Sequence, residues 1–207
     1  MPLILASEFN DSFHKTKKLL GDSLIEKKVT VILTAANGNG LNLDPSYPLY
    51  ERTIKPFEDL GLKVIHFDLE GKSSQEVKDQ ILSSDIIYVC GGNTFYLLKY
   101  MNDCNFKETL IQFLKQDGLY IGSSAGAIVM SPDIGFISIM DNQDIQGLNN
   151  HTGLNLIDFS FLPHLDHDEM GEDAHEIIEK YKNTDQTILA LNDDQALYIN
   201  KNIVKLI

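Results

Sequence analysis

The stretch LYIGSSAGAIVM, residues 119–130, places a G-x-S-x-G pattern between an apolar run typical of a β-strand and a run of small residues typical of a helix start. This is the pattern of a nucleophile elbow, a tight strand-to-helix turn that holds its central serine exposed at the end of a strand and under a helix N-terminus. Glycines flank the serine because side chains do not fit beside such a turn. The stretch therefore predicts that Ser124 is a hydrolytic nucleophile.

Strand-like and helix-like segments alternate before this elbow. Strands are expected at 2–6, 29–34, 63–67, 86–90 and 119–122, and helices at about 13–27, 49–60, 73–82, 94–101 and 105–116. The alternation predicts right-handed βαβ units and an α/β fold, a largely parallel sheet with helices on both faces. After the elbow the pattern predicts one helix at about 169–182 among short strands at 134–140, 157–162, 187–191, 196–200 and 203–207. No repeat or linker is apparent, so residues 1–207 are expected to form a single domain.

The composition excludes several classes of protein. The chain has 207 residues, 43% hydrophobic and 23% charged, which is typical of a soluble globular protein. A net charge of -13 argues against nucleic acid as a partner, since phosphate binding needs a basic face. No run of about 18 apolar residues exists, so no membrane span is expected, and the N-terminus lacks the basic flank of a signal peptide. We expect a cytoplasmic protein in which Cys90 and Cys104 are reduced and buried.

Three loops that follow predicted strands carry small or polar residues: Asn37-Gly38, Gly91-Gly92-Asn93 and Gly122-Ser123-Ser124. Because ligands of an open parallel sheet bind beyond the carboxyl ends of the strands, these loops should crowd one edge of the sheet. An oxyanion hole there needs two backbone N–H donors, and the elbow supplies that of Ala125. Gly91-Gly92 could supply the second, although the same pair could simply form a tight turn before a helix.

Among the six histidines, His164 is the best candidate for the general base. It follows Phe161-Leu162-Pro163 at the end of a strand-like run, and the proline ends that strand at the same sheet edge. The competitors include one histidine on a lysine-rich helix, one inside a strand and one on an acidic helix; the five are His14, His66, His151, His167 and His175.

The acid that would orient the histidine is expected at Asp193 or Asp194, directly after the strand-like run 187–191. Carboxylates are common in surface loops, so neither residue is a strong indication by itself. The weaker competitors are Asp133, Asp141, Asp144 and Asp158.

Residues 164–168 also have the composition of a metal site, with two imidazoles and two carboxylates. No second His/Cys cluster would complete it, so we favour a catalytic histidine followed by a polar helix start, in which Asp166, Asp168 and Glu169 favour the helix dipole. The loop at 37–40 lacks the G-x-G-x-x-G spacing of a nucleotide site. Neither a metal nor a cofactor is predicted.

Three segments together resemble peptidase family S51, the aspartyl dipeptidase (peptidase E) and cyanophycinase family of serine peptidases: CGGNTF at 90–95, IGSSAGA at 121–127 and Pro163-His164. The resemblance covers nearly the whole chain. It implies a flavodoxin-like three-layer sandwich similar to class I glutamine amidotransferases, with serine in place of the elbow cysteine. It also implies a serine peptidase for dipeptides or other short peptides, with these residue roles: Ser124 nucleophile, His164 base, Asp193 acid, Gly92 and Ala125 oxyanion donors, and Gly91 and Asn93 in the substrate pocket. We expect a short peptide as the partner and a monomer or homodimer as the state of the protein.

One departure from the family pattern bears on specificity. The family's aspartyl dipeptidases grip the substrate's aspartyl side chain with an arginine downstream of the histidine, but this chain has no arginine after Arg52. The corresponding region, 171–174, is acidic and apolar, which argues against strict Asp-X specificity. Lys180 or Lys182 could substitute only as point charges, and an acidic pocket would suit a free amino terminus or a basic side chain.

Two other functions remain open from the sequence. The same scaffold could carry a different amide or ester hydrolase, or a binding or regulatory protein that keeps the elbow without catalysis. The complete set of serine, histidine and acid argues against the second.

Overall fold

The computed structural model describes residues 2–21, 26–40 and 48–207. Within these ranges the main sheet has seven strands in the order β3-β2-β4-β5-β1-β8-β9. The strand pairs from β3 across to β1 are parallel, whereas β8 runs antiparallel to β1 and β9 antiparallel to β8. The bounds are β1 Pro2–Ala6, β2 Lys28–Ile32, β3 Lys63–Phe67, β4 Ile86–Val89, β5 Leu119–Ser123, β8 Ala196–Asn200 and β9 Ile203–Leu206. A separate pair of short parallel strands is formed by β6 Ser160–Leu162 and β7 Ile188–Ala190.

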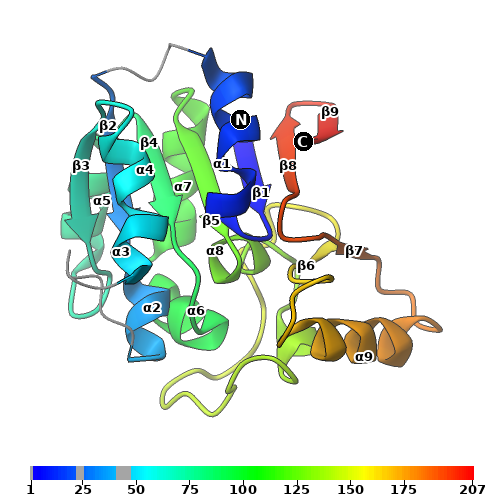
Figure 1. Ribbon diagram of the computed structural model, residues 1–207. Helices are drawn as coiled ribbons and strands as arrows, with labels where there is room; N and C mark the ends of the chain where they lie inside the picture. Colours follow the sequence, from blue (N-terminus) through cyan, green and yellow to red (C-terminus); the bar gives the residue numbers. More distant parts are fainter. Residues whose placement is uncertain (1, 22–25, 41–47) are drawn as a thin grey trace.

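Helices cover both faces of the main sheet, with α1, α3 and α4 in front and α5 and α7 behind (Figure 1). The helices of the described ranges are α1 Phe9–Leu20, α2 Thr34–Gly38, α3 Pro48–Thr53, α4 Lys55–Glu58, α5 Ser74–Leu82, α6 Thr94–Asp103, α7 Phe106–Lys115, α8 Ala125–Ile128 and α9 Gly171–Tyr181, together with the 3-10 turn η2 Gly135–Ile137. This arrangement confirms the predicted α/β fold, a largely parallel sheet in a flavodoxin-like three-layer sandwich.

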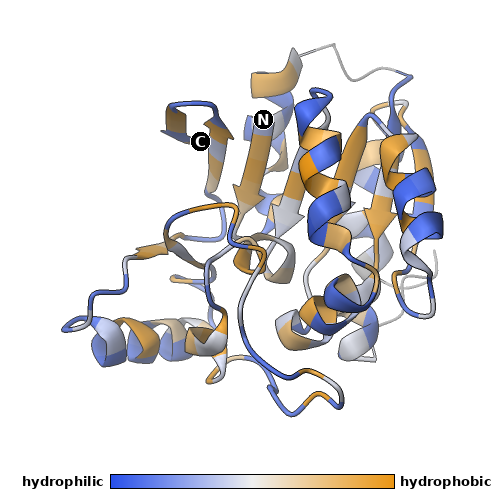
Figure 2. Cartoon of the chain, turned by 180° about the vertical axis from the view of Figure 1, so that it is seen from behind, coloured by the Kyte–Doolittle hydropathy of each residue, from blue (hydrophilic) through white to orange (hydrophobic). Residues whose placement is uncertain are grey.

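Alternate residues of the central strands pack into two separate hydrophobic cores, one on each face of the sheet. In β1, Leu3 and Leu5 pack into the core under α5, α6 and α7, whereas Ile4 packs into the core under α1 and α4. In β4, Ile87 and Tyr88 divide in the same way. Side chains of a strand alternate between the faces of its sheet, so a strand covered on both faces must be apolar throughout. Figure 2 shows the result as hydrophobic strands between helices that are hydrophilic on their outer sides.

Three predicted element bounds in the N-terminal half are wrong or only partly covered. α1 ends at Leu20, followed by Gly21 at φ 62, rather than near residue 27, and residues 22–25 lie outside the described ranges. The predicted loop at 37–48 begins inside α2, and its part at 41–47 is likewise outside them. The single helix predicted at 49–60 is interrupted at Ile54 between α3 and α4, because Pro56 has no N–H to continue the helical hydrogen bonds.

Two predictions after the elbow also need correction. The predicted strand at 134–140 is instead the 3-10 turn Gly135–Ile137 followed by further turn residues, because the Asp133 carboxylate accepts the Gly135 N–H at 2.7 Å and starts a turn there. α9 begins at Gly171, so its first-turn acids are Glu172 and Asp173 rather than residues 166–169. No helix in the described part of the chain is long and apolar enough to cross a membrane.

Candidate active site

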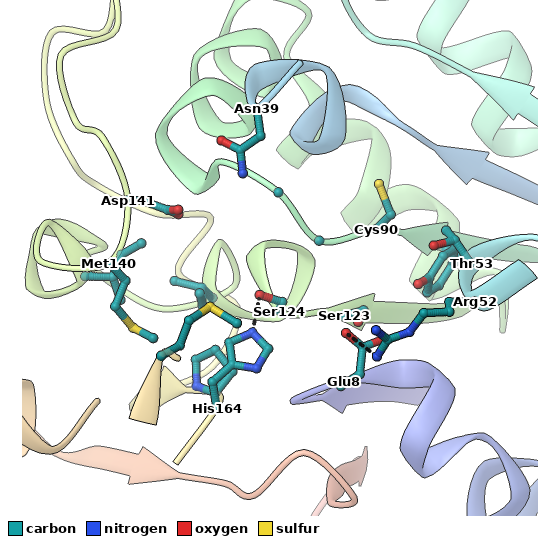
Figure 3. Close-up of a pocket in the computed structure, with 17 residues that line it drawn as sticks. Glu8, Asn39, Arg52, Thr53, Cys90, Ser123, Ser124, Met140, Asp141 and His164 are labelled. Carbon is teal, nitrogen blue, oxygen red and sulfur yellow. Dashed lines mark hydrogen bonds and ion pairs between the residues drawn. The ribbon is translucent and has the colours of Figure 1, made fainter. Parts of the chain in front are cut away.

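A cavity of about 280 Å³ lies beside the residues that follow β4 and β5. These two strands end toward the bottom of the view in Figure 1. The elbow and the loop after β4 both reach it, as the strand-end rule predicts. Figure 3 shows Ser124 and His164 near its centre, with Asp141 at one end and Glu8 and Arg52 at the other. The lining residues are Glu8, Asn39, Arg52, Thr53, Tyr88, Cys90, Gly91, Gly92, Ser123, Ser124, Ile128, Ile137, Met140, Asp141, Pro163, His164 and Met170.

The elbow requires glycine on both sides of its serine. A Cβ on Gly122 would lie 2.3 Å from the carbonyl oxygen of Gly126, and a Cβ on Gly126 would lie 2.3 Å from that of Val89. α8 therefore lies too close to β5 at Gly122, and too close to β4 at Gly126, for side chains at these positions. Ser124 itself has φ 48 and ψ -111, a strained conformation that its backbone hydrogen bond to Ala6, 3.1 Å long, helps to hold.

Two hydrogen bonds connect serine, histidine and acid in series. The Ser124 Oγ lies 2.9 Å from the His164 Nε2, and the His164 Nδ1 lies 2.7 Å from the Asp193 Oδ1. His164 is 4% exposed, so its ring is confined between these two partners. This is the connectivity in which a carboxylate orients an imidazole and the imidazole takes the proton of a hydroxyl.

The structure brings Asp193, and not its neighbour, to the histidine. The Asp193 N–H donates to the Asp166 carboxylate at 2.8 Å, which holds the loop after β7. The Asp194 carboxylate turns away to the surface, where it pairs with Lys15 at 2.8 Å. The sequence left open whether Asp193 or Asp194 contacts the histidine, and in the structure the path of this loop gives that contact to Asp193.

Ser7 supports both the histidine and the acid, and the sequence gives no motif for it. Its hydroxyl donates to the Asp193 Oδ1 at 2.8 Å and accepts the backbone N–H of His164 at 2.7 Å. His164 has φ 65, a left-handed conformation that this bond helps to hold. Only its position in the sequence indicates Ser7, because it directly follows β1 and so lies at the same edge of the sheet as the elbow.

The carboxyl group of Asp193 has a lowered pKa. Burial by itself raises the pKa, but the hydrogen bond and charge of His164 and the hydrogen bond from Ser7 outweigh it. The acid beside the histidine is therefore held as a carboxylate.

The predicted oxyanion donors lie on either side of Ser124. Gly92 has φ 137, and a Cβ there would lie 2.1 Å from the carbonyl oxygen of Ala35, so the position admits only glycine. A Cβ on Gly91 would lie 3.3 Å from that of Ser124, which places this loop directly against the elbow. Within the described ranges, the N–H groups of Gly92 and Ala125 donate to no protein acceptor. Both remain available to a ligand.

The prediction that Asn93 lines the substrate pocket needs correction. Its side-chain oxygen accepts the N–H of Tyr96 at 2.8 Å as the N-cap of α6. Its amide nitrogen donates to the carbonyl oxygen of Asn142 at 3.0 Å, and the residue is 3% exposed. Since both polar ends are used inside the protein, Asn93 positions the Gly91-Gly92 loop rather than facing the cavity.

No sequence motif indicates three charged residues of the cavity wall, Glu8, Arg52 and Asp141. The Asp141 carboxylate accepts the N–H of Thr94 at 2.8 Å, and burial raises its pKa although that bond opposes the rise. Burial likewise raises the pKa of Glu8 against the charge of Arg52. The sequence ranked Asp141 only as a weak alternative for the acid and marked Arg52 only as the single arginine. No local pattern connects these residues.

The competing histidines have other surroundings. His167 Nδ1 accepts the N–H of Glu169 at 3.1 Å, so this ring closes the turn before α9. His151 packs edge-on against Phe95, and neither His14, His66 nor His175 lines the cavity. In the part of the chain that the structure describes, no group of three or more His, Cys, Asp or Glu could hold a metal ion.

Both cysteines are free and buried, as predicted. Burial raises the pKa of the Cys90 thiol to about 12 and that of the Cys104 thiol to about 11. Neither is a thiolate near neutral pH, so neither competes with Ser124 as a nucleophile.

Sequence comparison places the chain among known peptidases. Residues 3–207 match the profile of peptidase family S51. A Listeria monocytogenes protein named uncharacterized peptidase Lmo0363 is 33% identical over 95% of this chain and 93% of its own length. Peptidase E of a Nostoc species is 27% identical over 94% of this chain and 77% of its own length.

Solved structures agree with these relatives. A crystal structure from Listeria monocytogenes, described provisionally as a peptidase E protein, superposes with a TM-score of 0.86 at 31% identity and covers 99% of this chain and 96% of its own. A peptidase from an acI-B1 Actinobacterium, 16% identical with a TM-score of 0.66, shares the fold over 100% of this chain and 86% of its own.

Proposed function

The chain belongs to peptidase family S51 and is a serine peptidase, and from this premise we propose that it hydrolyses dipeptides or other short peptides through Ser124, His164 and Asp193. The observation that supports this most directly is the series of two hydrogen bonds, 2.9 and 2.7 Å long, that runs through the buried His164. The lowered pKa of Asp193 also supports it, because the acid must stay ionised beside the histidine.

The mechanism follows from this geometry. Ser124 Oγ attacks the carbonyl carbon of the scissile peptide bond while His164 Nε2 takes the hydroxyl proton. The N–H groups of Gly92 and Ala125 stabilise the resulting oxyanion. The imidazolium, held by the Asp193 carboxylate, then protonates the leaving amine, and the C–N bond breaks. A water molecule repeats the sequence on the acyl-enzyme, which releases the acid product and restores Ser124.

The size and charge of the cavity support a short substrate with a free amino terminus. A volume of about 280 Å³ is at the small end of ligand pockets, which suits a dipeptide better than a folded chain. Asp141 places a half-buried carboxylate in its wall, where a substrate ammonium group would compensate the charge. The wall beside it is apolar and carries Ile137, Met140 and Met170, which favours an apolar side chain over an aspartyl side chain.

A serine-directed fluorophosphonate and a dipeptide panel test the proposal. Wild-type protein should be labelled at Ser124 and should cleave dipeptides, whereas Ser124→Ala should do neither and keep its circular dichroism and melting temperature. The control Ser83→Ala removes an exposed hydroxyl at the end of α5 and should behave as wild type. Cleavage by Ser124→Ala at the wild-type rate would exclude the mechanism.

The same two experiments separate the other functions. A binding or regulatory protein would not be labelled at Ser124. A different amide or ester hydrolase would be labelled but would cleave amide or ester substrates rather than the dipeptides of the panel.

A further inference from the structure

The cavity has a second charged end, opposite Asp141. Glu8 and Arg52 line it there, together with Thr53, Tyr88 and Cys90. Figure 3 shows the Arg52 guanidinium extending toward Glu8, on the other side of Ser124 from Asp141. Arg52 comes from α3 and Glu8 from the cap of α1, so the two meet only in the folded chain.

The Arg52 guanidinium retains unused hydrogen-bonding capacity. Its Nη2 lies 3.9 Å from the Glu8 Oε2, which is an ion pair but too long for a hydrogen bond. Among the described residues no acceptor is hydrogen-bonded to the guanidinium, and its side chain is 54% exposed. A guanidinium offers five N–H donors in a planar fork that matches a carboxylate. One end of the cavity thus presents an unfilled site for a carboxylate.

Glu8 is the counter-charge that keeps Arg52 at this place. Its Oε1 accepts the N–H of Asn10 as the N-cap of α1, at 3.4 Å, so the carboxylate is anchored to a helix end. The ion pair to Arg52 uses the other oxygen, Oε2. An anchored carboxylate holds the guanidinium near the cavity without occupying its donors.

The charge of the whole protein makes this one cation important. The net charge of -13 repels carboxylates, so an anionic ligand group needs a local positive charge. Arg52 is the single arginine of the chain and the one lysine or arginine among the described residues that line the cavity. The cavity therefore has the Asp141 carboxylate at one end and, at the other, the Arg52 guanidinium with the Glu8 carboxylate 3.9 Å away.

We propose that Arg52 binds the C-terminal carboxylate of the substrate, so that the cavity selects peptides short enough to place a free amino terminus near Asp141 and a free carboxylate on Arg52. This inference rests on the proposed function and assigns its substrate class, the zwitterionic dipeptide. A C-terminal amide leaves the guanidinium without its partner, and a longer peptide displaces its carboxylate from the site. The cavity then selects peptides by their length, because the Asp141 carboxylate and the Arg52 guanidinium lie at fixed positions on either side of Ser124.

Binding measurements in a Ser124→Ala background test this without turnover. Isothermal titration compares alanyl-leucine with alanyl-leucine amide. We expect the free acid to bind about tenfold more tightly than the amide, as one charge-assisted carboxylate contact allows. Adding Arg52→Gln to the Ser124→Ala background should bring the ratio of the two affinities, free acid over amide, to about one. Arg52→Lys in the same background should keep part of the preference for the free acid. The control Lys55→Gln removes a nearby exposed cation outside the cavity and should leave the ratio unchanged.

Each result decides the inference. Equal binding of acid and amide, binding of neither peptide, or an unchanged ratio in Arg52→Gln would overturn it. A ratio that falls equally in Lys55→Gln would also overturn it, since the effect would then be general electrostatics. Fluorophosphonate labelling of Ser124 in wild-type protein and in Arg52→Gln reports the proposed function separately, because that probe carries no carboxylate.

Discussion

Replacing Ser7 with alanine should weaken both the fold and the catalysis, although Ser7 does not line the cavity. Its hydroxyl makes two strong contacts at once, to the Asp193 carboxylate at 2.8 Å and from the His164 N–H at 2.7 Å. The residue is fully buried, so no water replaces the lost oxygen. The His164 N–H would be left without an acceptor while the residue must keep φ 65.

The magnitude follows from these contacts. An unsatisfied buried N–H costs about 1–3 kcal/mol, and a hydrogen bond to a charged group is worth about 1.5–3 kcal/mol. Because Asp193 keeps its bond to His164, we expect a total loss of about 2–4 kcal/mol. For a chain of this size each kcal/mol lowers the melting temperature by about 2–4 °C, so the melting temperature should fall by about 4–16 °C. Misplacement of the imidazole should lower kcat by about 10–100-fold and change KM little.

The assay pairs thermal unfolding with dipeptide hydrolysis, with Ser12→Ala as the matched control. Ser12 is also a buried serine near the start of α1, but its hydroxyl donates only to the nearby carbonyls of Glu8 and Phe9. That variant should keep its kcat. If Ser7→Ala matches Ser12→Ala in both kcat and melting temperature, Ser7 does not support the site and the reasoning fails.

Three other substitutions examine the remaining groups. Asp193→Asn should be less stable than wild type above pH 3.8, and the difference in unfolding free energy should shrink as the pH falls below that value, because a carboxyl with a lowered pKa stabilises the fold only while it is ionised. Denaturant unfolding from pH 3 to pH 7 measures this difference. A difference that does not depend on pH would contradict the expectation. Asp141→Asn should lower kcat/KM about tenfold for a dipeptide with a free amino terminus and much less for its N-acetyl analogue, and equal losses would speak against an ammonium site. Gly92→Ala should cost about 3 kcal/mol or more, because its Cβ would lie 2.1 Å from the Ala35 carbonyl oxygen at φ 137; an unchanged denaturation midpoint would refute that.

Much of the architecture could be predicted because its signals are local. Apolar runs such as 86–90 mark strands buried on both faces, and the helix predicted at 73–82 matches α5, which begins with a capping box of Ser73 and Glu76. The 134–140 run failed because periodicity does not report whether a partner strand exists. The single helix predicted at 49–60 is wrong because Pro56 cannot donate the hydrogen bond that would join α3 to α4.

Within the site, the sequence alone determines which residues follow each strand. Parallel strands of one sheet deliver their carboxyl ends to one edge, so Gly92 and Ser124 could be identified from their positions along the chain. His164 follows β6, which pairs with β7 in a separate sheet, so the prediction that its strand ends at the same sheet edge is wrong, and the tertiary structure brings His164 to the site. The glycines of the elbow are set by the same local cause, since a Cβ at Gly122 would lie 2.3 Å from a backbone oxygen.

The partners of these residues depend on the tertiary structure. Asp193 and Asp194 are neighbours with the same chemistry, and only the path of their loop sends one to His164 and the other to Lys15. Ser7 reaches Asp193 across 186 positions of the chain, a contact that no local pattern encodes. The pairing of Arg52 with Glu8 likewise arises where α3 packs beside α1, whose N-cap is Glu8. Side-chain contacts of this kind act over a few ångströms, so they exist only after distant segments have been brought together.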